Sequence, residues 1–190
     1  MEKQISAYQF ISMYENLGYD IGRLGCIMLD IDPEDLGKRV SEAIKPEEVY
    51  VDEDPASYAT GIVAGEPHVT LLYGLLRSGP EMQKHILQVL NSGNVCPPTV
   101  QIDEVGYFDS PKADEPYYCI VAHLVITPEL QECNERLKFL PHINTFPGYK
   151  AHMTLAYIKE DELVRDRVIE ELNTMLRGRL LPTKGLNFGS

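Results

Sequence analysis

The sequence predicts an α+β fold with mostly antiparallel strands, and three observations support this prediction. Strand-like and helix-like segments follow one another as strand, helix, strand, helix, two strands, helix, strand, helix. Tandem strand–helix–strand units with a Gly-rich phosphate loop do not occur, which disfavours a doubly wound parallel sheet. The hydrophobic share of 44% and the charged share of 24% are ordinary for a globular chain and exclude disorder as the dominant state.

The chain begins with a segment that we expect to be helical. Residues 4–17 place apolar side chains at helical spacing, and Gly18 suits the end of a helix. We therefore expect a helical extension over residues 1–22, followed by a single domain over residues 23–190. The extension has early acidic residues and no long apolar run, so it does not resemble a signal peptide.

The remaining elements follow from local patterns. Continuous apolar runs predict strands, amphipathic spacing predicts helices, and Thr127 followed by Pro128 is typical of a helix start. The expected strands are residues 24–31, 68–74, 100–108, 117–126 and 152–158, and the expected helices are residues 33–44, 78–93, 127–140 and 159–178. Residues 45–66 are expected to be a loop with a short strand at 61–64, and residues 184–190 an added edge strand.

Composition and charge narrow the classes of function. The net charge is −12, whereas binding to a long polyanion gains affinity when Lys and Arg replace its counterions. We therefore expect no long nucleic acid as a partner, although a small anionic ligand can still bind in a locally basic pocket. No apolar stretch is long enough to span a membrane, so we expect no membrane partner and a cytoplasmic protein. The four cysteines form no C-x-x-C pair, which disfavours a zinc or redox motif and fits a reducing compartment.

One short motif occurs twice. His68-Val69-Thr70-Leu71 returns 84 residues later as His152-Met153-Thr154-Leu155, and each copy continues to a tyrosine, Tyr73 or Tyr157. Alternate residues of a strand face the same side, so each copy presents a histidine and a threonine on one face. Two such strands beside a cleft would present two imidazoles and two hydroxyls to one ligand.

This set of side chains suits metal-independent cleavage of a phosphodiester. One neutral histidine can take a proton from water or a ribose hydroxyl, and the other, when protonated, can donate one to the leaving oxygen. The two threonine hydroxyls can stabilise charge on the phosphate oxygens. The sequence does not say which histidine is the base. No acidic or thiol side chains complete a metal site around either histidine, so neither a metal nor another cofactor is expected.

The paired motifs resemble those of the 2H phosphoesterase superfamily, which includes 2′-5′ RNA ligase-like proteins, cyclic phosphodiesterases and viral enzymes that degrade signalling oligonucleotides. The resemblance covers roughly residues 24–188. It implies two pseudo-symmetric lobes with antiparallel sheets around a central cleft and helices outside. It also implies that His68, Thr70, His152 and Thr154 are catalytic. Pro67 fits the family pattern before the first histidine, whereas Ala151 departs from it before the second. The stretch PHVTLLYGL also resembles phage-encoded members.

Other side chains are candidates for substrate binding. Arg77 and Lys150 are the basic residues nearest the motifs, and Tyr149 and Phe146 precede the second motif in a turn-rich loop. His123 fits either a buried, hydrogen-bonded histidine or a residue that lines the cleft. By strand counting, Tyr73 and Tyr157 should point away from the motif face and pack in the core. Base stacking has five aromatic candidates, among which the sequence does not decide: Tyr107, Phe108, Tyr117, Phe146 and Tyr149.

Several functions are consistent with these observations. The leading hypothesis is a phosphodiesterase that hydrolyses a small nucleotide: a 2′,3′-cyclic phosphate, a 2′-5′ oligonucleotide or a cyclic oligonucleotide signal. If the chain is encoded by a phage, removal of a host immune signal, an anti-CBASS activity, is a natural role. The alternatives are RNA end processing or 2′-5′ RNA ligation, and a non-catalytic protein that sequesters a cyclic nucleotide. Sequestration needs no proton donors, so the presence of both histidines argues against it.

Overall fold

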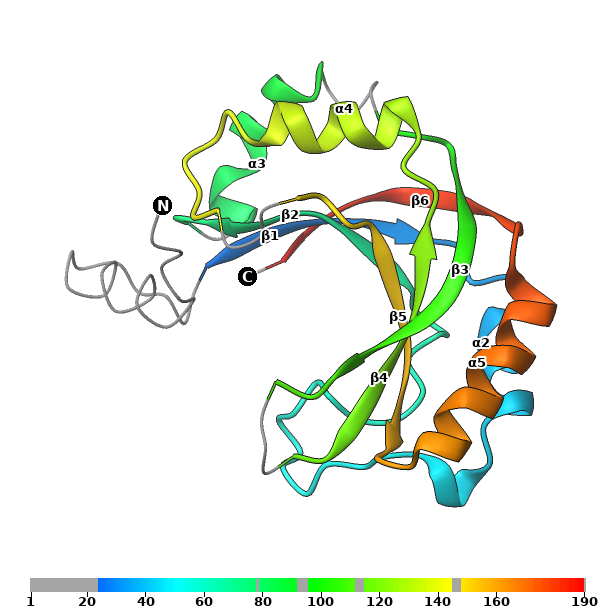
Figure 1. Ribbon diagram of the computed structural model, residues 1–190. Helices are drawn as coiled ribbons and strands as arrows, with labels where there is room; N and C mark the ends of the chain where they lie inside the picture. The colour runs from blue at the N-terminus through cyan, green and yellow to red at the C-terminus, as the bar shows by residue number, and fades with distance from the viewer. Residues whose placement is uncertain (1–23, 78, 92–95, 112–114, 145–147, 190) are drawn as a thin grey trace, which may run out of the picture.

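A six-stranded antiparallel sheet organises the computed structural model, which describes residues 24–77, 79–91, 96–111, 115–144 and 148–189 (Figure 1). The strands are β1 (Gly25–Ile31), β2 (His68–Leu75), β3 (Thr99–Asp109), β4 (Tyr117–Leu124), β5 (His152–Lys159) and β6 (Leu180–Gly189). The α-helices of the described residues are α2 (Leu36–Ala43), α3 (Gly79–Val89), α4 (Pro128–Leu137) and α5 (Glu162–Leu176), and Pro46–Glu48 form a short 3₁₀ helix.

The sheet consists of two three-stranded halves joined at its centre. The strand order is β2-β1-β6-β3-β4-β5, and the short β6–β3 pairing connects the halves from Thr99↔Pro182 to Gln101↔Leu180. The α+β fold with antiparallel sheets and outer helices is therefore confirmed. The expectation of an edge strand at the C-terminus is wrong, because β6 lies at the centre and pairs with both β1 and β3. The edges are instead the two motif strands, β2 and β5.

The helices pack on one face of the sheet and leave the other face open. Figure 1 shows α3 and α4 outside the first half and α2 and α5 outside the second. Strands β1 and β2 send alternate apolar side chains, such as Ile27, Leu29 and Val69, into the core beneath these helices. A fully buried side chain of this kind stabilises the fold by about 1.5–3 kcal/mol. The outward-curving face is thus apolar, and the inward-curving face is left for polar residues.

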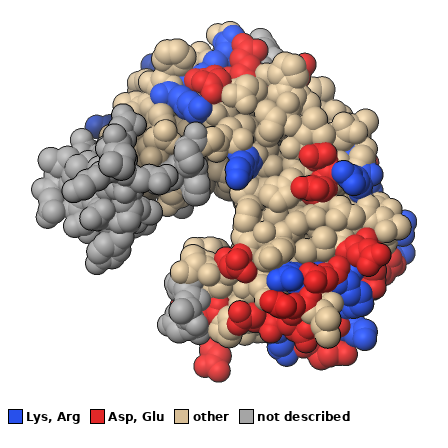
Figure 2. Space-filling view, in the orientation of Figure 1, with Lys and Arg blue, Asp and Glu red and all other residues tan. Residues whose placement is uncertain are grey.

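The open face curves around a hollow. Strands β2 and β5 lie in contact although they are at opposite ends of the strand order, so the sheet bends back on itself. Figure 2 shows the hollow between the two halves of the molecule, with mostly uncharged residues on its visible wall. Asp and Glu gather instead over the half that carries α2 and α5.

Most of the expected elements are confirmed, with small changes at their ends. Helix α4 begins as predicted, with the Leu130 amide donating to the Thr127 hydroxyl at 3.2 Å. Helix α2 starts at Leu36 rather than at Pro33, and residues 61–64 form an isolated bridge to β5 rather than a strand. The expected helix at residues 4–17 lies outside the described residues. None of the helices in the described part of the chain is long and apolar enough to span a bilayer.

Candidate active site

The two motifs lie on the two edge strands and have matching side-chain burial. In β2, His68 is exposed, Val69 is buried and Thr70 is half-buried. In β5, His152 and Thr154 are half-buried on either side of the buried Met153. The predicted alternation is confirmed, because in each strand the histidine and threonine share the open face while the residue between them joins the core.

A shift of strand register follows the threonine in both motifs. Along β2 the pairing with β1 skips Leu71, and along β5 the pairing with β4 skips Leu155. An extra residue in a strand reverses the facing of all residues after it. Tyr73 and Tyr157 therefore lie on the same face as the motif threonines, which corrects the expectation from strand counting. Tyr73 is 44% exposed rather than in the core, whereas Tyr157 is buried at 9%.

The strands next to the motifs extend this correspondence between the two halves. Residues directly opposite each other in an antiparallel pair share a face of the sheet. Each motif therefore has three neighbours on the open face. Strand β1 places Asp30, Met28 and Cys26 opposite His68, Thr70 and Tyr73, and strand β4 places His123, Val121 and Cys119 opposite His152, Thr154 and Tyr157.

Each motif strand is bound along its outer edge by the segment that precedes the other motif. The segment leading into β2 reaches β5, where the amides of Val63 and Ala64 both donate to the Leu155 carbonyl oxygen at 2.9 and 3.0 Å. The segment leading into β5 reaches β2, where the Ile143 amide donates to the Gly74 carbonyl oxygen at 2.8 Å. These reciprocal bonds hold the two edge strands together.

The backbone around the first motif depends on two further residues. Gly74 has φ +96°, and an added Cβ would lie 2.5 Å from the Ile143 carbonyl oxygen, so only glycine fits this close approach. The buried Asn134 of α4 donates through Nδ2 to the Leu71 carbonyl oxygen at 2.7 Å. This hydrogen bond satisfies a carbonyl that the register shift would otherwise leave without a partner in the core.

The ring of His152 is oriented by its own backbone. Its Nδ1 lies 2.9 Å from the Lys150 carbonyl oxygen. A carbonyl oxygen only accepts, so Nδ1 carries the proton of this hydrogen bond and Nε2 of the neutral ring keeps its lone pair. The ring is flanked by Phe108, whose centroid is 5.1 Å away. His152 is therefore suited to accept a proton through Nε2.

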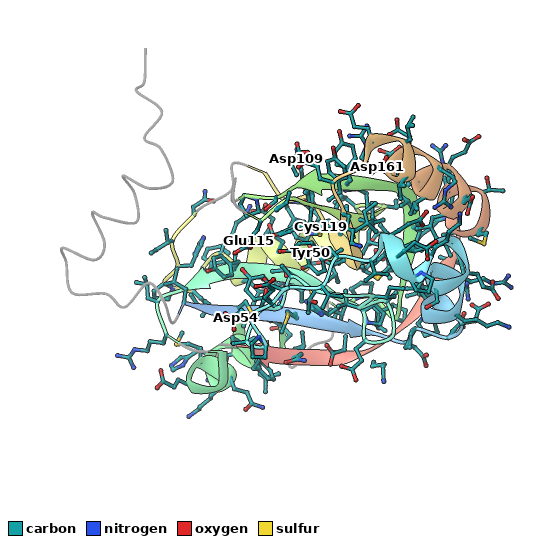
Figure 3. All side chains as sticks on the ribbon, turned by 90° about the horizontal axis from the view of Figure 1, so that it is seen from below. Tyr50, Asp54, Asp109, Glu115, Cys119 and Asp161 are labelled. Carbon is teal, nitrogen blue, oxygen red and sulfur yellow. The ribbon has the colours of Figure 1, made fainter. Side chains whose placement is uncertain are left out.

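The Thr154 hydroxyl hydrogen-bonds to the Cys119 thiol, which also bonds to the Tyr157 hydroxyl. Cys119 packs with Tyr50 against the small cluster of Ala59, Tyr117 and Tyr157 (Figure 3). Burial raises the pKa of Cys119, so the sulfur stays protonated near neutral pH. Both hydroxyls act on the sulfur as hydrogen-bond donors, which lowers the pKa of the thiol, but burial is the larger effect.

His68 lies opposite a carboxylate, whereas His152 lies opposite another histidine. Asp30 lies opposite His68, and its two carboxylate oxygens accept from the Asn187 amide nitrogen at 3.1 and 3.2 Å. The residue opposite His152 is instead His123, an imidazole. The two motifs match in sequence, but their electrostatic surroundings differ.

The other predicted binding residues lie in different settings. Arg77 is exposed just after β2, and Lys150 is exposed just before β5. Tyr149 packs against the main core with its hydroxyl buried and without a partner, and this burial weighs against contact with a substrate. Phe146 lies outside the described residues. Within the described residues, no group of three His, Cys, Asp or Glu side chains could hold a metal ion.

Sequence reasoning missed three residues of this face: Asp30, Cys119 and Gly74. Asp30 and Cys119 belong to no sequence motif, and only the strand pairing shows that each lies beside a motif strand on the open face. The sequence did contain one signal for the shared register shift, the tyrosine that follows each motif at the same distance. A residue repeated at the same position is expected if the two strands have the same irregularity before it.

Comparison with known proteins shows similarity of fold. No family model matches the chain, and no curated protein matches it. The structure of Kluyveromyces marxianus Usb1 with uridine monophosphate aligns with a TM-score of 0.51 and 14% identity, covering 88% of this chain and 95% of that one. Another structure of Kluyveromyces marxianus Usb1 aligns with a TM-score of 0.48 and 13% identity, covering 90% of this chain and 96% of that one. The fold of this chain is therefore similar to that of Usb1.

Proposed function

We propose that this protein is a metal-independent phosphodiesterase of the 2H type that hydrolyses a small nucleotide. The observation that carries the proposal is the repeated His-x-Thr motif on two edge strands that are in contact, with the same register shift after each copy. The substrate is a 2′,3′-cyclic phosphate, a 2′-5′ oligonucleotide or a cyclic oligonucleotide. A cyclic oligonucleotide signal would make the protein an anti-defence enzyme, as the resemblance to phage proteins implies.

The surroundings of the two histidines support a division of roles. The neutral His152 ring accepts a proton through Nε2 from the attacking water, whose oxygen forms a new bond to phosphorus. His68, which lies opposite Asp30, donates a proton to the leaving oxygen as the old P–O bond breaks. One water is consumed, and the two histidines exchange protonation states, which solvent then restores.

The threonines stabilise the charge that develops on the phosphate. Thr70 and Thr154 each share a face with the histidine two residues earlier, so their hydroxyls can donate to the non-bridging oxygens. The similarity to the fold of Usb1, whose structure was determined with uridine monophosphate, adds support for a nucleotide ligand.

RNA end processing or 2′-5′ RNA ligation is the first alternative. It would use the same two histidines on a longer substrate, so the site alone does not separate it from the main proposal. Sequestration without turnover is the other alternative, and it predicts that the histidines bind but do not react. The length of the preferred substrate distinguishes RNA end processing from hydrolysis of a small nucleotide. The number of turnovers distinguishes both from sequestration.

The experiment that tests the proposal is incubation with a panel of 2′,3′-cyclic, 2′-5′-linked and cyclic nucleotides, analysed by chromatography with and without EDTA. We expect multiple turnovers on at least one short substrate, unaffected by EDTA. His68→Ala and His152→Ala should each lower kcat about 10²- to 10⁴-fold. Thr70→Ala and Thr154→Ala should lower it less, since each removes one donor.

The matched control is His85→Ala, which removes an exposed histidine from α3 on the outer side of the sheet. It should retain full activity. Full turnover by either His68→Ala or His152→Ala would overturn the two-histidine mechanism. Loss of turnover in EDTA that added metal restores would place the protein in a different mechanistic class.

A further inference from the structure

Phe108 is an aromatic side chain on the open face beside His152. It lies opposite Cys119 in the β3–β4 pairing, which places it on the same face as the motif residues of β5. Its side chain is 39% exposed. A large apolar ring that remains exposed next to a set of catalytic groups has no role in the core and is available to a ligand.

The other aromatic candidates for base stacking are held elsewhere. Tyr107 is on the opposite face, where the Arg165 guanidinium lies 4.5 Å from its ring centroid. Tyr117 is buried at 6%, and Tyr149 is packed against the main core. Phe146 lies outside the described residues. Among these four described candidates, Phe108 alone is both exposed and on the motif face, and Tyr73, which the register shift brings to that face, lies on β2 beside the other motif.

Two imidazoles border the Phe108 ring without covering it. The ring of His152 stands at 80° to it with centroids 5.1 Å apart, and the ring of His123 stands at 85° with centroids 5.7 Å apart. Because both imidazoles are nearly perpendicular, neither stacks flat on Phe108. The exposed part of the phenyl ring can therefore take a flat aromatic group.

Gly106 provides the space for His123 in this arrangement. An added Cβ at Gly106 would lie 3.0 Å from Nε2 of His123, so a side chain there would force the imidazole to move. Burial, together with the nearby His152, lowers the pKa of His123. Near neutral pH the ring is therefore uncharged, and it contributes an aromatic surface and hydrogen-bonding nitrogens rather than a positive charge.

We propose that Phe108 and His123 form a subsite for a nucleobase beside His152. The proposal rests on the phosphodiesterase function above, because it places the base of a nucleotide whose phosphate lies at His152. The base stacks on Phe108, and His123 borders its edge. This subsite makes the preferred substrate a nucleotide rather than any phosphodiester of similar charge, with little preference among bases, since every base has a π-face.

The test uses the lack of tryptophan in this chain. Phe108→Trp introduces a single tryptophan at the subsite, and Tyr107→Trp introduces one on the opposite face of the same strand at 38% exposure as the matched control. AMP, GMP, CMP and UMP should quench the Phe108→Trp fluorescence saturably, whereas ribose 5-phosphate should not. The Tyr107→Trp fluorescence should respond to none of them.

A second variant measures the energetic contribution. Phe108→Leu should weaken binding of the four nucleoside monophosphates on the order of 10- to 100-fold by calorimetry, with ribose 5-phosphate binding unchanged. Thermal unfolding of each variant confirms that it is folded. Nucleotide affinity equal to that of the unaltered protein, or equal quenching at both tryptophan positions, would overturn the base subsite.

The outcomes separate this inference from the proposed function. If His68→Ala and His152→Ala abolish turnover while Phe108→Leu binds nucleotides normally, the phosphodiesterase stands and the base subsite is wrong. If Phe108→Leu loses nucleotide binding while the two histidine variants hydrolyse their substrate at the full rate, the base subsite stands and the two-histidine mechanism is wrong.

Discussion

Two histidines with the same local sequence have different neighbours, and this difference defines the chemistry at the scale of single residues. His68 lies opposite Asp30, whereas His152 lies opposite His123, with their ring centroids 6.4 Å apart. The two copies of the motif therefore differ in the side chain that faces each histidine across the strand pair.

His123 predicts a dependence of stability on pH. Burial and then His152 lower its pKa in the folded protein, where Glu104, Lys150 and Asp103 also act on it. In the unfolded chain its pKa returns to about 6.5, so between the folded and unfolded values the unfolded state binds more protons. The neutral His123 ring therefore makes its full contribution to the stability of the fold above the unfolded pKa of about 6.5. This contribution is lost as the pH falls from that value through the lower pKa of the folded state.

We expect the thermal unfolding temperature to decrease when the pH is lowered from 7.5 to 5.5. The substitution His123→Gln should make this decrease smaller. The exposed His85 provides the control, because His85→Gln should leave the pH dependence as it was. Scanning calorimetry at several pH values measures both. An identical pH dependence in His123→Gln and the unaltered protein would show that His123 does not titrate with folding.

At the scale of elements, the site depends on how β2 and β5 are held together. The segment before each motif hydrogen-bonds to the strand that carries the other motif. Each of the two motif strands is therefore bound by a segment from the other half of the chain. The close approach of the Ile143 segment to Gly74 is one of these contacts.

Gly74→Ala tests this arrangement, with Gly61→Ala as its matched control. Both glycines have positive φ, but an added Cβ meets the Ile143 carbonyl oxygen at Gly74 and nothing within 4 Å at Gly61. Gly61→Ala should lower the free energy of unfolding only by the backbone strain, about 1 kcal/mol. Gly74→Ala should lower it by about 2 kcal/mol or more, because the added Cβ also meets the carbonyl oxygen. Urea unfolding measures both, and equal losses would mean that the approach of the two segments contributes nothing.

At the scale of the whole molecule, charge and shape lead to a prediction about the size of the ligand. The protein carries a net charge of −12, and Asp and Glu gather over one half while the visible wall of the hollow is mostly uncharged (Figure 2). Long nucleic acid would have to run past acidic surface, whereas a small nucleotide needs only the hollow. The overall charge therefore favours short or cyclic ligands.

This charge distribution predicts both the preferred length and the response to salt. Matched di- and trinucleotides should be cleaved faster than a twenty-nucleotide RNA. A ligand with one to three phosphate contacts should show a shallow slope of log affinity against log salt, about −0.7 to −2. Cleavage and binding at several salt concentrations measure both. A preference for the long RNA with a steep slope would favour RNA processing instead.

The sequence by itself determined the local elements and the alternation of side chains along the motif strands. Apolar runs marked β1, β2 and β5, the Thr127-Pro128 pair marked the start of α4, and the repeated motif marked the strand faces that carry polar groups. These features depend on residues a few positions apart, where periodicity and capping act directly. The expected alternation of His68, Val69 and Thr70 is confirmed, because successive side chains of any regular strand point to opposite faces.

Only the tertiary structure decided which residues surround the motifs. The central position of β6, the register shifts at Leu71 and Leu155, and the exposure of Phe108 all arise from pairings between distant segments. Strand counting failed for Tyr73 because one extra residue reverses every later side chain. Pairing partners are chosen by the packing of the whole sheet, and a local pattern contains no information about residues far away in the chain.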